Sequence, residues 1–214
     1  AARTFADVVA IDPANSRGNG LLEMLRAHPA GAGERLAALR AAAGRPDATL
    51  ADWRALAFAL AREEQDEEAA DLLRGVIDRA PDDADAHLAL AHLHLRSDAA
   101  PRAVPHLHHV LALRPDDHRT RVVLAWLHAA GTDLGLRDPV LAVELARTAC
   151  NRTQFADARC VDALAGALAA AGDLPYAIET AERALRTAEA SEPGLAVWIR
   201  RRLDLYRRGG RLGD

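Results

Sequence analysis

Residues 50–83, LADWRALAFALAREEQDEEAADLLRGVIDRAPDD, align without gaps to residues 84–117, ADAHLALAHLHLRSDAAPRAVPHLHHVLALRPDD. Large, small and apolar residues recur at the same places in both segments. In the first segment these places hold Trp53, Leu56, Ala57, Leu60, Ala69, Leu73, Val76 and Pro81. In the second they hold His87, Leu90, Ala91, His94, Ala103, Leu107, Val110 and Pro115. Such a repeat indicates an array whose units pack on their neighbours.

The residue types at these places indicate a pair of helices in each segment. Small residues such as Ala57 and Ala69 let two helices approach closely, and the larger residues fill the space between them. Pro81 and Pro115 end the second helix, because proline cannot continue a helix. The Asp-Asp pair after each proline suits the N-terminus of the following helix.

This pattern resembles the tetratricopeptide repeat: a large residue, leucine, a small residue and a large one on the first helix, then alanine and apolar residues on the second, and a closing proline. The resemblance implies an all-α fold. We expect a right-handed α–α superhelix of about five repeats with a C-terminal capping helix, and about eleven or twelve antiparallel helices in all.

The pattern continues in both directions with decreasing fidelity, and the repeat that follows residue 117 has an insertion between its two helices. We expect the second helix of a truncated repeat at 1–15, a degenerate repeat at 16–49, repeats at 50–83, 84–117, 118–157 and 158–191, and a capping helix with a tail at 192–214. Because the chain begins halfway through a repeat, we expect it to be part of a longer protein.

Composition narrows the range of functions. The net charge of the 214 residues is −4, which gives no electrostatic basis for binding nucleic acid. All 27 basic residues are arginine, which excludes a P-loop lysine or a Schiff-base lysine. The sequence has no HExxH, GxGxxG, CxxC or serine-hydrolase pattern, and no apolar run long enough to span a membrane. We therefore expect a non-catalytic protein without a cofactor.

The histidines are concentrated between residues 87 and 128. His87 and His94 stand where Trp53 and Leu60 stand one repeat earlier, so we expect both to pack between paired helices. The same reasoning applies to His128. On the second helix of the repeat lie His106, His108 and His109, and we expect the middle two to face outward and to be partly exposed to water. No spacing among these residues is diagnostic of a metal site, so a histidine-based metal-binding module is a weak alternative.

The ninth position of each repeat faces the concave groove in the fold that the resemblance implies. Met24, Phe58, His92 and Trp126 occupy this position, and neighbouring groove positions hold Arg54, Arg62, Leu88, Arg96, Arg119 and Val122. An apolar floor edged by arginines suits a peptide with apolar anchors and acidic flanks. The alternative is that Phe58 and Trp126 pack against adjoining helices and leave no open groove.

We therefore expect a scaffold that binds a protein or peptide in this groove. The lysines and asparagines with which the family clamps chaperone C-termini are absent, since Arg54 and Phe58 stand in their places. A second hypothesis is an accessory domain of a larger enzyme or membrane-bound protein. Its basis is that residues from Trp126 onward resemble C-terminal tetratricopeptide modules of large bacterial proteins. The sequence leaves the partner and the cellular compartment open.

Cys150 and Cys160 are the only cysteines. They lie about one turn on either side of a shared connection between antiparallel helices, so their Cα atoms are expected at similar heights. Both a disulfide and two buried free thiols agree with this placement. A disulfide would favour a compartment outside the cytoplasm.

Overall fold

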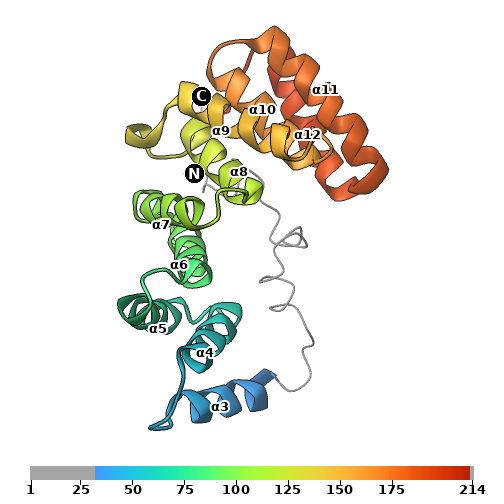
Figure 1. Ribbon diagram of the computed structural model, residues 1–214. Helices are drawn as coiled ribbons and strands as arrows, with labels where there is room; N and C mark the ends of the chain where they lie inside the picture. The colour runs from blue at the N-terminus through green and yellow to red at the C-terminus, as the bar shows by residue number, and fades with distance from the viewer. Residues whose placement is uncertain (1–31, 213–214) are drawn as a thin grey trace. The chain divides into compact units, whose positions relative to one another are not determined.

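The structure is a computed structural model of the chain and describes residues 32–212 (Figure 1). Met24, the predicted helix within 1–15 and the part of the predicted repeat 16–49 before residue 32 lie outside the described residues. Within residues 32–212 all regular secondary structure is helical. The predicted all-α class is therefore confirmed for this part of the chain.

The helices succeed one another with short connections. They are α3 (Ala32–Ala43), α4 (Leu50–Arg62), α5 (Asp66–Arg79), α6 (Ala84–Arg96), α7 (Ala100–Leu113), α8 (His118–Ala130), the 3-10 helix η2 (Leu134–Leu136), α9 (Pro139–Arg152), α10 (Ala158–Ala170), α11 (Leu174–Ser191) and α12 (Pro193–Arg207). The first helices of successive pairs, α4, α6, α8 and α10, each have 13 residues. Equal lengths of this kind follow from the repeated sequence pattern.

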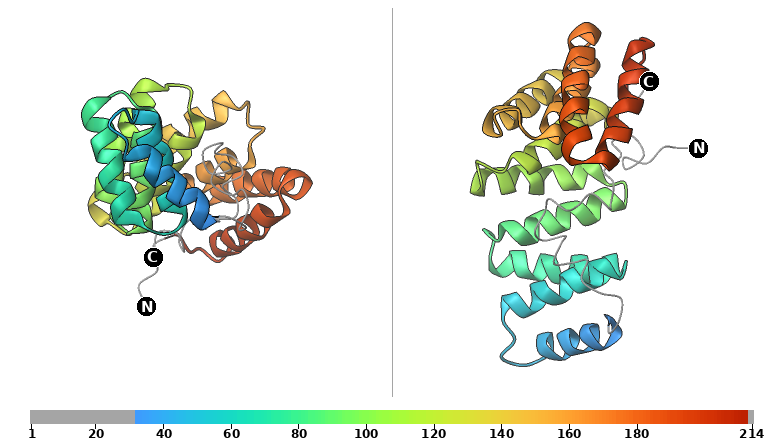
Figure 2. Two further views of the ribbon diagram at one scale, coloured as in Figure 1. Left: turned by 90° about the horizontal axis from the view of Figure 1, so that it is seen from below. Right: turned by 90° about the vertical axis from the view of Figure 1, so that its right-hand side faces the viewer.

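The described residues form two compact units, one made of residues 32–113 and the other of residues 114–212. Within the first unit each helix from α3 to α7 packs on its sequence neighbours, and Figure 2 shows them in succession. Within the second unit α8 packs on α9 and on α10, and α11 packs on both α10 and α12. Each unit is thus a stack of helix pairs in which contacts form between near neighbours.

Aspartates begin most of these helices. The carboxylate of Asp83 accepts a hydrogen bond from the Ala86 amide, and Asp117 accepts from the amides of Arg119 and Thr120. Both aspartates are the second residue of the Asp-Asp pairs that follow the closing prolines. Each satisfies amide groups that lack partners within the first helical turn.

The core of the unit 32–113 consists of the repeated small and apolar positions. Those less than 3% exposed are Ala57, Leu60, Ala69, Leu73, Val76, Leu90, Ala91, Ala103, Leu107 and Val110. The alanines allow the helices to approach closely, and the leucines fill the remaining space. Truncation of one such leucine to alanine is expected to destabilise the fold by roughly 2–5 kcal/mol.

The insertion in the third pair forms the connection between α8 and α9 and contains η2. His128, which is 7% exposed, holds this connection through its Nδ1 atom, 2.7 Å from the carbonyl oxygen of Leu136. Because a carbonyl can only accept, the Nδ1 atom carries the hydrogen. His128 is therefore a packing residue, as the sequence predicts.

Hydropathy along the helices shows that none within residues 32–212 has the length and apolar character needed to cross a bilayer.

Candidate partner-binding surface

The predicted groove residues of the unit 32–113 come from α4 and α6. Arg54, Phe58 and Arg62 follow one another at intervals of four residues, so they lie along one side of α4. The equivalent residues of α6 are Leu88, His92 and Arg96. Phe58, Arg62 and His92 are half-buried, which leaves part of each side chain at the surface.

Two of the predicted groove arginines form hydrogen bonds and ion pairs with neighbouring helices. The Nη1 atom of Arg54 lies 2.6 Å from the carboxylate of Asp83, which also caps α6. Arg96 donates to the carbonyl oxygen of Ala61 at 2.8 Å and pairs with Asp66. Both ion pairs are partly exposed to solvent, so each contributes little stability of its own. Through these contacts Arg54 joins α4 to the N-terminus of α6, and Arg96 joins α6 to the turn between α4 and α5.

Leu88 and Trp126 are corrections to the predicted groove. Leu88 is 9% exposed and Trp126 is 4% exposed, so neither offers a side chain to a ligand. Trp126 packs within the unit 114–212, where its ring lies against Gly166 and under the guanidinium of Arg202 at 5.2 Å. For Trp126 the structure agrees with the packing alternative. The other groove candidates of α8 remain accessible, since Arg119 is exposed and Val122 is half-buried.

Four histidines gather between α6 and α7 in the unit 32–113. His87 is 7% exposed, and its Nδ1 atom lies 2.8 Å from the Nδ1 atom of His106. The His109 ring lies 4.3 Å from that of His87, and the His94 ring stacks on His106 at 5.9 Å. The packing predicted for His87 and His94 is confirmed. The rings of His106 and His109 lie beside that of His87, while His108 is exposed and the His109 side chain is still 39% exposed.

Hydrogen bonds define the proton positions in this histidine cluster. The Nε2 atom of His87 lies 2.8 Å from the carbonyl oxygen of Pro81, so Nε2 carries a hydrogen. In the contact between His87 and His106, one Nδ1 atom donates and the other accepts. Burial, with the neighbouring histidines, lowers the pKa of His106 to about 4. Both ring nitrogens of His87 are engaged in hydrogen bonds within the protein.

Both cysteines are buried free thiols. The disulfide that the sequence left open is therefore not formed in this structure. Burial raises the pKa of each thiol to about 12, so both are protonated at neutral pH. Sequence reasoning missed a different arrangement: Cys160 lies beside His118 and Asp157. The insertion in the third pair lengthens the stretch of sequence between His118 and Asp157. The spacing of the three residues along the sequence therefore matches no common metal motif.

A shallow pocket between α10 and α11 was also missed from the sequence. Its lining residues are Phe155, Val161, Leu164, Tyr176, Glu179, Thr180, Arg183 and Arg186. The backbone of Phe155 is left-handed, with φ at 59°, and the Arg183 guanidinium lies 4.6 Å above the Phe155 ring. Such backbone geometry is rare for a bulky residue and has no sequence signature. It presents an aromatic ring beside arginines, a composition common in binding hot spots.

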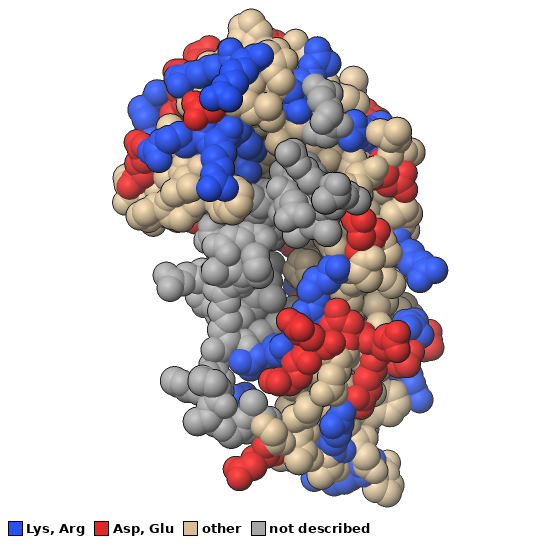
Figure 3. All heavy atoms as spheres, turned by 180° about the vertical axis from the view of Figure 1, so that it is seen from behind, with Lys and Arg blue, Asp and Glu red and all other residues tan. Residues whose placement is uncertain are grey.

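Charge is distributed unevenly within each unit. On the face shown in Figure 3, basic side chains gather over α11 and α12, and acidic side chains gather over α5 and the turn before it. The exposed arginines of α11 and α12 are Arg183, Arg186, Arg200, Arg201 and Arg207. The pocket between α10 and α11 therefore lies beside a surface that attracts acidic groups.

Comparison with solved structures shows what kind of helix stack this is. MamA residues 41-end from Desulfovibrio magneticus RS-1 has a TM-score of 0.67 and 18% identity, covering 85% of this chain and 98% of that one. MamA MSR-1 C2 has a TM-score of 0.62 and 19% identity, covering 84% and 98%. A chain of the APC/C hetero-tetramer Cut9-Hcn1 has a TM-score of 0.64 and 19% identity, covering 95% and 40%.

These neighbours are tetratricopeptide-repeat proteins. This chain has the tetratricopeptide-repeat fold. The α solenoid predicted from the 34-residue period is thereby confirmed. No protein-family model matches the chain, and no curated protein matches it. At identities below one fifth the likeness concerns the fold alone, so the function of this tetratricopeptide-repeat chain must be argued from its own residues.

Proposed function

We propose that this chain is a non-catalytic scaffold that binds a peptide segment of a partner protein along the first helices of its repeats. One observation carries the proposal. Phe58 and His92 occupy the same position in successive repeats, and both remain partly exposed while the repeated apolar positions around them are buried. Large side chains in such a row suit an extended or helical ligand with apolar anchors.

The charge of this surface favours a ligand with acidic residues. Arg62 and Arg96 lie one turn beyond Phe58 and His92 on α4 and α6. Arg96 already pairs with Asp66, but its side chain is still 44% exposed and can take a second carboxylate. The fold supports the same kind of function, since the APC/C neighbour is part of a hetero-tetramer. The partner segment can belong to another protein or to another domain of the same polypeptide.

Selection from a displayed library of random peptides tests the proposal, because it needs no identified partner. We expect the selected peptides to combine apolar and acidic residues. Phe58→Ala should weaken their binding by at least tenfold, whereas Tyr176→Ala, which alters the pocket between α10 and α11, should leave their affinity unchanged. Leu90→Ala serves as the stability reference, because Leu90 is a core residue with 2% exposure.

The outcomes separate the two surfaces. If Phe58→Ala lowers the melting temperature as much as Leu90→Ala does and leaves peptide affinity unchanged, Phe58 is a packing residue and the proposed surface is wrong. If Tyr176→Ala removes binding while Phe58→Ala does not, the pocket between α10 and α11 is the binding site. That pocket is the second candidate surface because it combines Phe155 and Tyr176 with two arginines.

A further inference from the structure

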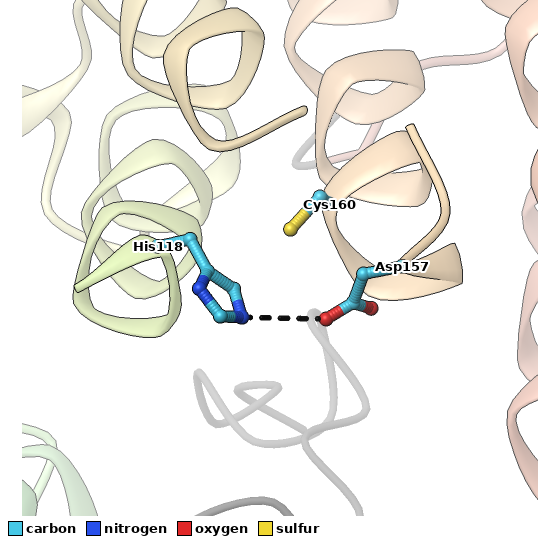
Figure 4. A group of neighbouring side chains, drawn as sticks. All are labelled: His118, Asp157 and Cys160. Atoms are coloured by element: carbon cyan, nitrogen blue, oxygen red, sulfur yellow. Dashed lines mark ion pairs between the residues drawn. The ribbon is translucent and has the colours of Figure 1, made fainter. Parts of the chain in front are cut away.

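Three side chains of metal-ligand type face one another at the N-terminal ends of α8 and α10 (Figure 4). His118 is the first residue of α8, Asp157 caps α10, and Cys160 lies in the first turn of α10. Their ligand atoms all lie within 4.8 Å of one another. The Nε2 atom of His118 and the Oδ2 atom of Asp157 are 3.6 Å apart. All three residues belong to the unit 114–212.

Local structure fixes the direction of the Asp157 carboxylate. One carboxylate oxygen of Asp157 accepts a hydrogen bond from the amide of Arg159 at 2.8 Å, so the other oxygen is directed toward His118. Cys160 is fully buried, so its thiol lies on the core side of the group. His118 and Asp157 retain partial exposure, with 30% and 22% of their side chains open to solvent. The group therefore has a buried sulfur and an opening to water.

Nearby arginines are committed to other carboxylates. Arg159 forms a two-pronged pair with Glu192, and Arg152 pairs with Asp116. Burial and the neighbouring Asp157 carboxylate raise the pKa of the Cys160 thiol to about 12. The group thus holds one carboxylate and one protonated thiol. A divalent cation among them would favour the thiolate, because its charge offsets both burial and the repulsion from Asp157.

We propose that His118, Asp157 and Cys160 bind a zinc ion, with water in the fourth position. Nitrogen, oxygen and sulfur are the donors that zinc takes, at about 2.0–2.1, 2.0–2.2 and 2.3 Å. Tetrahedral ligands at those lengths lie roughly 3.3–3.6 Å apart. The separation of 3.6 Å between Nε2 of His118 and Oδ2 of Asp157 is at the upper end of this range. The three ligand atoms, which lie within 4.8 Å of one another, would move closer together on binding.

Charge and protons balance in this binding step. The aspartate and the cysteine thiolate supply two negative charges, which match the two positive charges of zinc. Binding releases the thiol proton of Cys160 to solvent, and no electron transfer is involved. The ion would join the first helices of two successive repeats, α8 and α10, and fix their spacing. Without a metal, the same residues form a histidine–aspartate contact beside a core thiol, and this is the interpretation to be excluded.

Titration of the 214-residue chain with zinc chloride and with cobalt chloride tests the site. We expect one equivalent of zinc to bind, to raise the melting temperature and to release one proton per ion near neutral pH. Cobalt should give the near-ultraviolet absorption of a thiolate-to-metal charge transfer. This band reports sulfur coordination and distinguishes the site from adventitious binding by other histidines.

Matched variants complete the test. Cys160→Ser, His118→Gln and Asp157→Asn should each weaken zinc binding by at least tenfold, and Asn at position 157 preserves the helix cap. Cys160→Ser should also abolish the cobalt charge-transfer band. Cys150→Ser is the control, because Cys150 is equally buried but lies outside the group. The proposal is overturned if the wild-type chain gives no charge-transfer band, or if Cys160→Ser binds zinc as tightly as Cys150→Ser does.

Discussion

Trp126 packs its indole ring onto the backbone of Gly166, so closely that a Cβ atom at residue 166 would lie 2.2 Å from the ring atom Cζ3. The absence of a side chain at Gly166 is what admits the ring. This contact joins α8 to α10, the first helices of successive pairs. It places a large aromatic residue in the core of the unit 114–212, where the repeat pattern alone would leave it at the surface.

Gly166→Ala is expected to destabilise the protein by about 1–3 kcal/mol, because the methyl group forces the Trp126 ring out of a well-packed site. A Cβ atom added at Gly194, in the first turn of α12, would have no neighbouring atom within 4 Å. Gly194→Ala is the control and should leave stability unchanged or raise it slightly. Urea unfolding of both variants measures the difference. Equal stability of the two would show that the Trp126 ring adjusts freely.

The buried ion pair between Asp162 and Arg202 attaches the last helix to the rest of its unit. Their side chains are 3% and 6% exposed, and the Nε atom of Arg202 lies 3.1 Å from Asp162. Burial raises the pKa of Asp162, and Arg202 opposes this by favouring the charged form. Arg202→Met leaves an unpaired buried carboxylate, so we expect a loss of about 3–5 kcal/mol in unfolding free energy.

Replacement of both partners tests this explanation. The double variant Asp162→Leu with Arg202→Met should recover most of the lost stability, because no buried charge remains. Arg201→Met, at an exposed site over the Trp198 ring, should change stability by less than about 1 kcal/mol. A double variant as unstable as the single one would mean that packing, not charge, decides the effect.

Because His106 lies in the histidine cluster, we expect the unfolding free energy to depend on pH. The pKa of His106 is lowered to about 4 in the folded chain, against 6.5 for an ordinary histidine. Between these values the unfolded chain binds a proton that the folded chain does not, so unfolding free energy falls as the pH decreases from about 6.5 to about 4. Burial is the largest cause of this shift, and electrostatic interactions with His87, His94 and His109 add to it.

His106→Gln removes the titrating group and should flatten the stability profile over this range. His108→Gln, on the exposed side of the same helix, should leave the slope unchanged. Chemical denaturation at a series of pH values from about 7.5 to about 4 provides the measurement. A slope that is the same in His106→Gln and in the wild type would show that His106 does not respond as a buried neutral histidine.

The 34-residue period was sufficient to predict the helices and the buried alanines, because each of these depends on the residue's own repeat. It was not sufficient to predict the contacts of side chains that pack against the next repeat. Phe58 and Trp126 hold the same repeat position, but only Trp126 faces a glycine that admits its ring. His118, Asp157 and Cys160 come together because α8 and α10 lie side by side, and an alignment of single repeats does not show which side chains meet between them.

The last prediction concerns the turn between the two helices of a pair. Glu64, Asp98 and Gly172 each stand fourteen residues after the start of a first helix, and their φ angles are 59°, 55° and 92°. This left-handed backbone favours glycine, because a Cβ atom clashes with the backbone there. A Cβ at residue 172 would meet no atom closer than 3.5 Å, so only backbone strain opposes a side chain. Gly172→Ala should therefore lower unfolding free energy by about 1 kcal/mol, whereas Glu64→Gly should leave it unchanged or raise it by up to about 1 kcal/mol. Urea denaturation of both variants checks the opposite signs, and a stabilising Gly172→Ala would contradict the shared turn geometry.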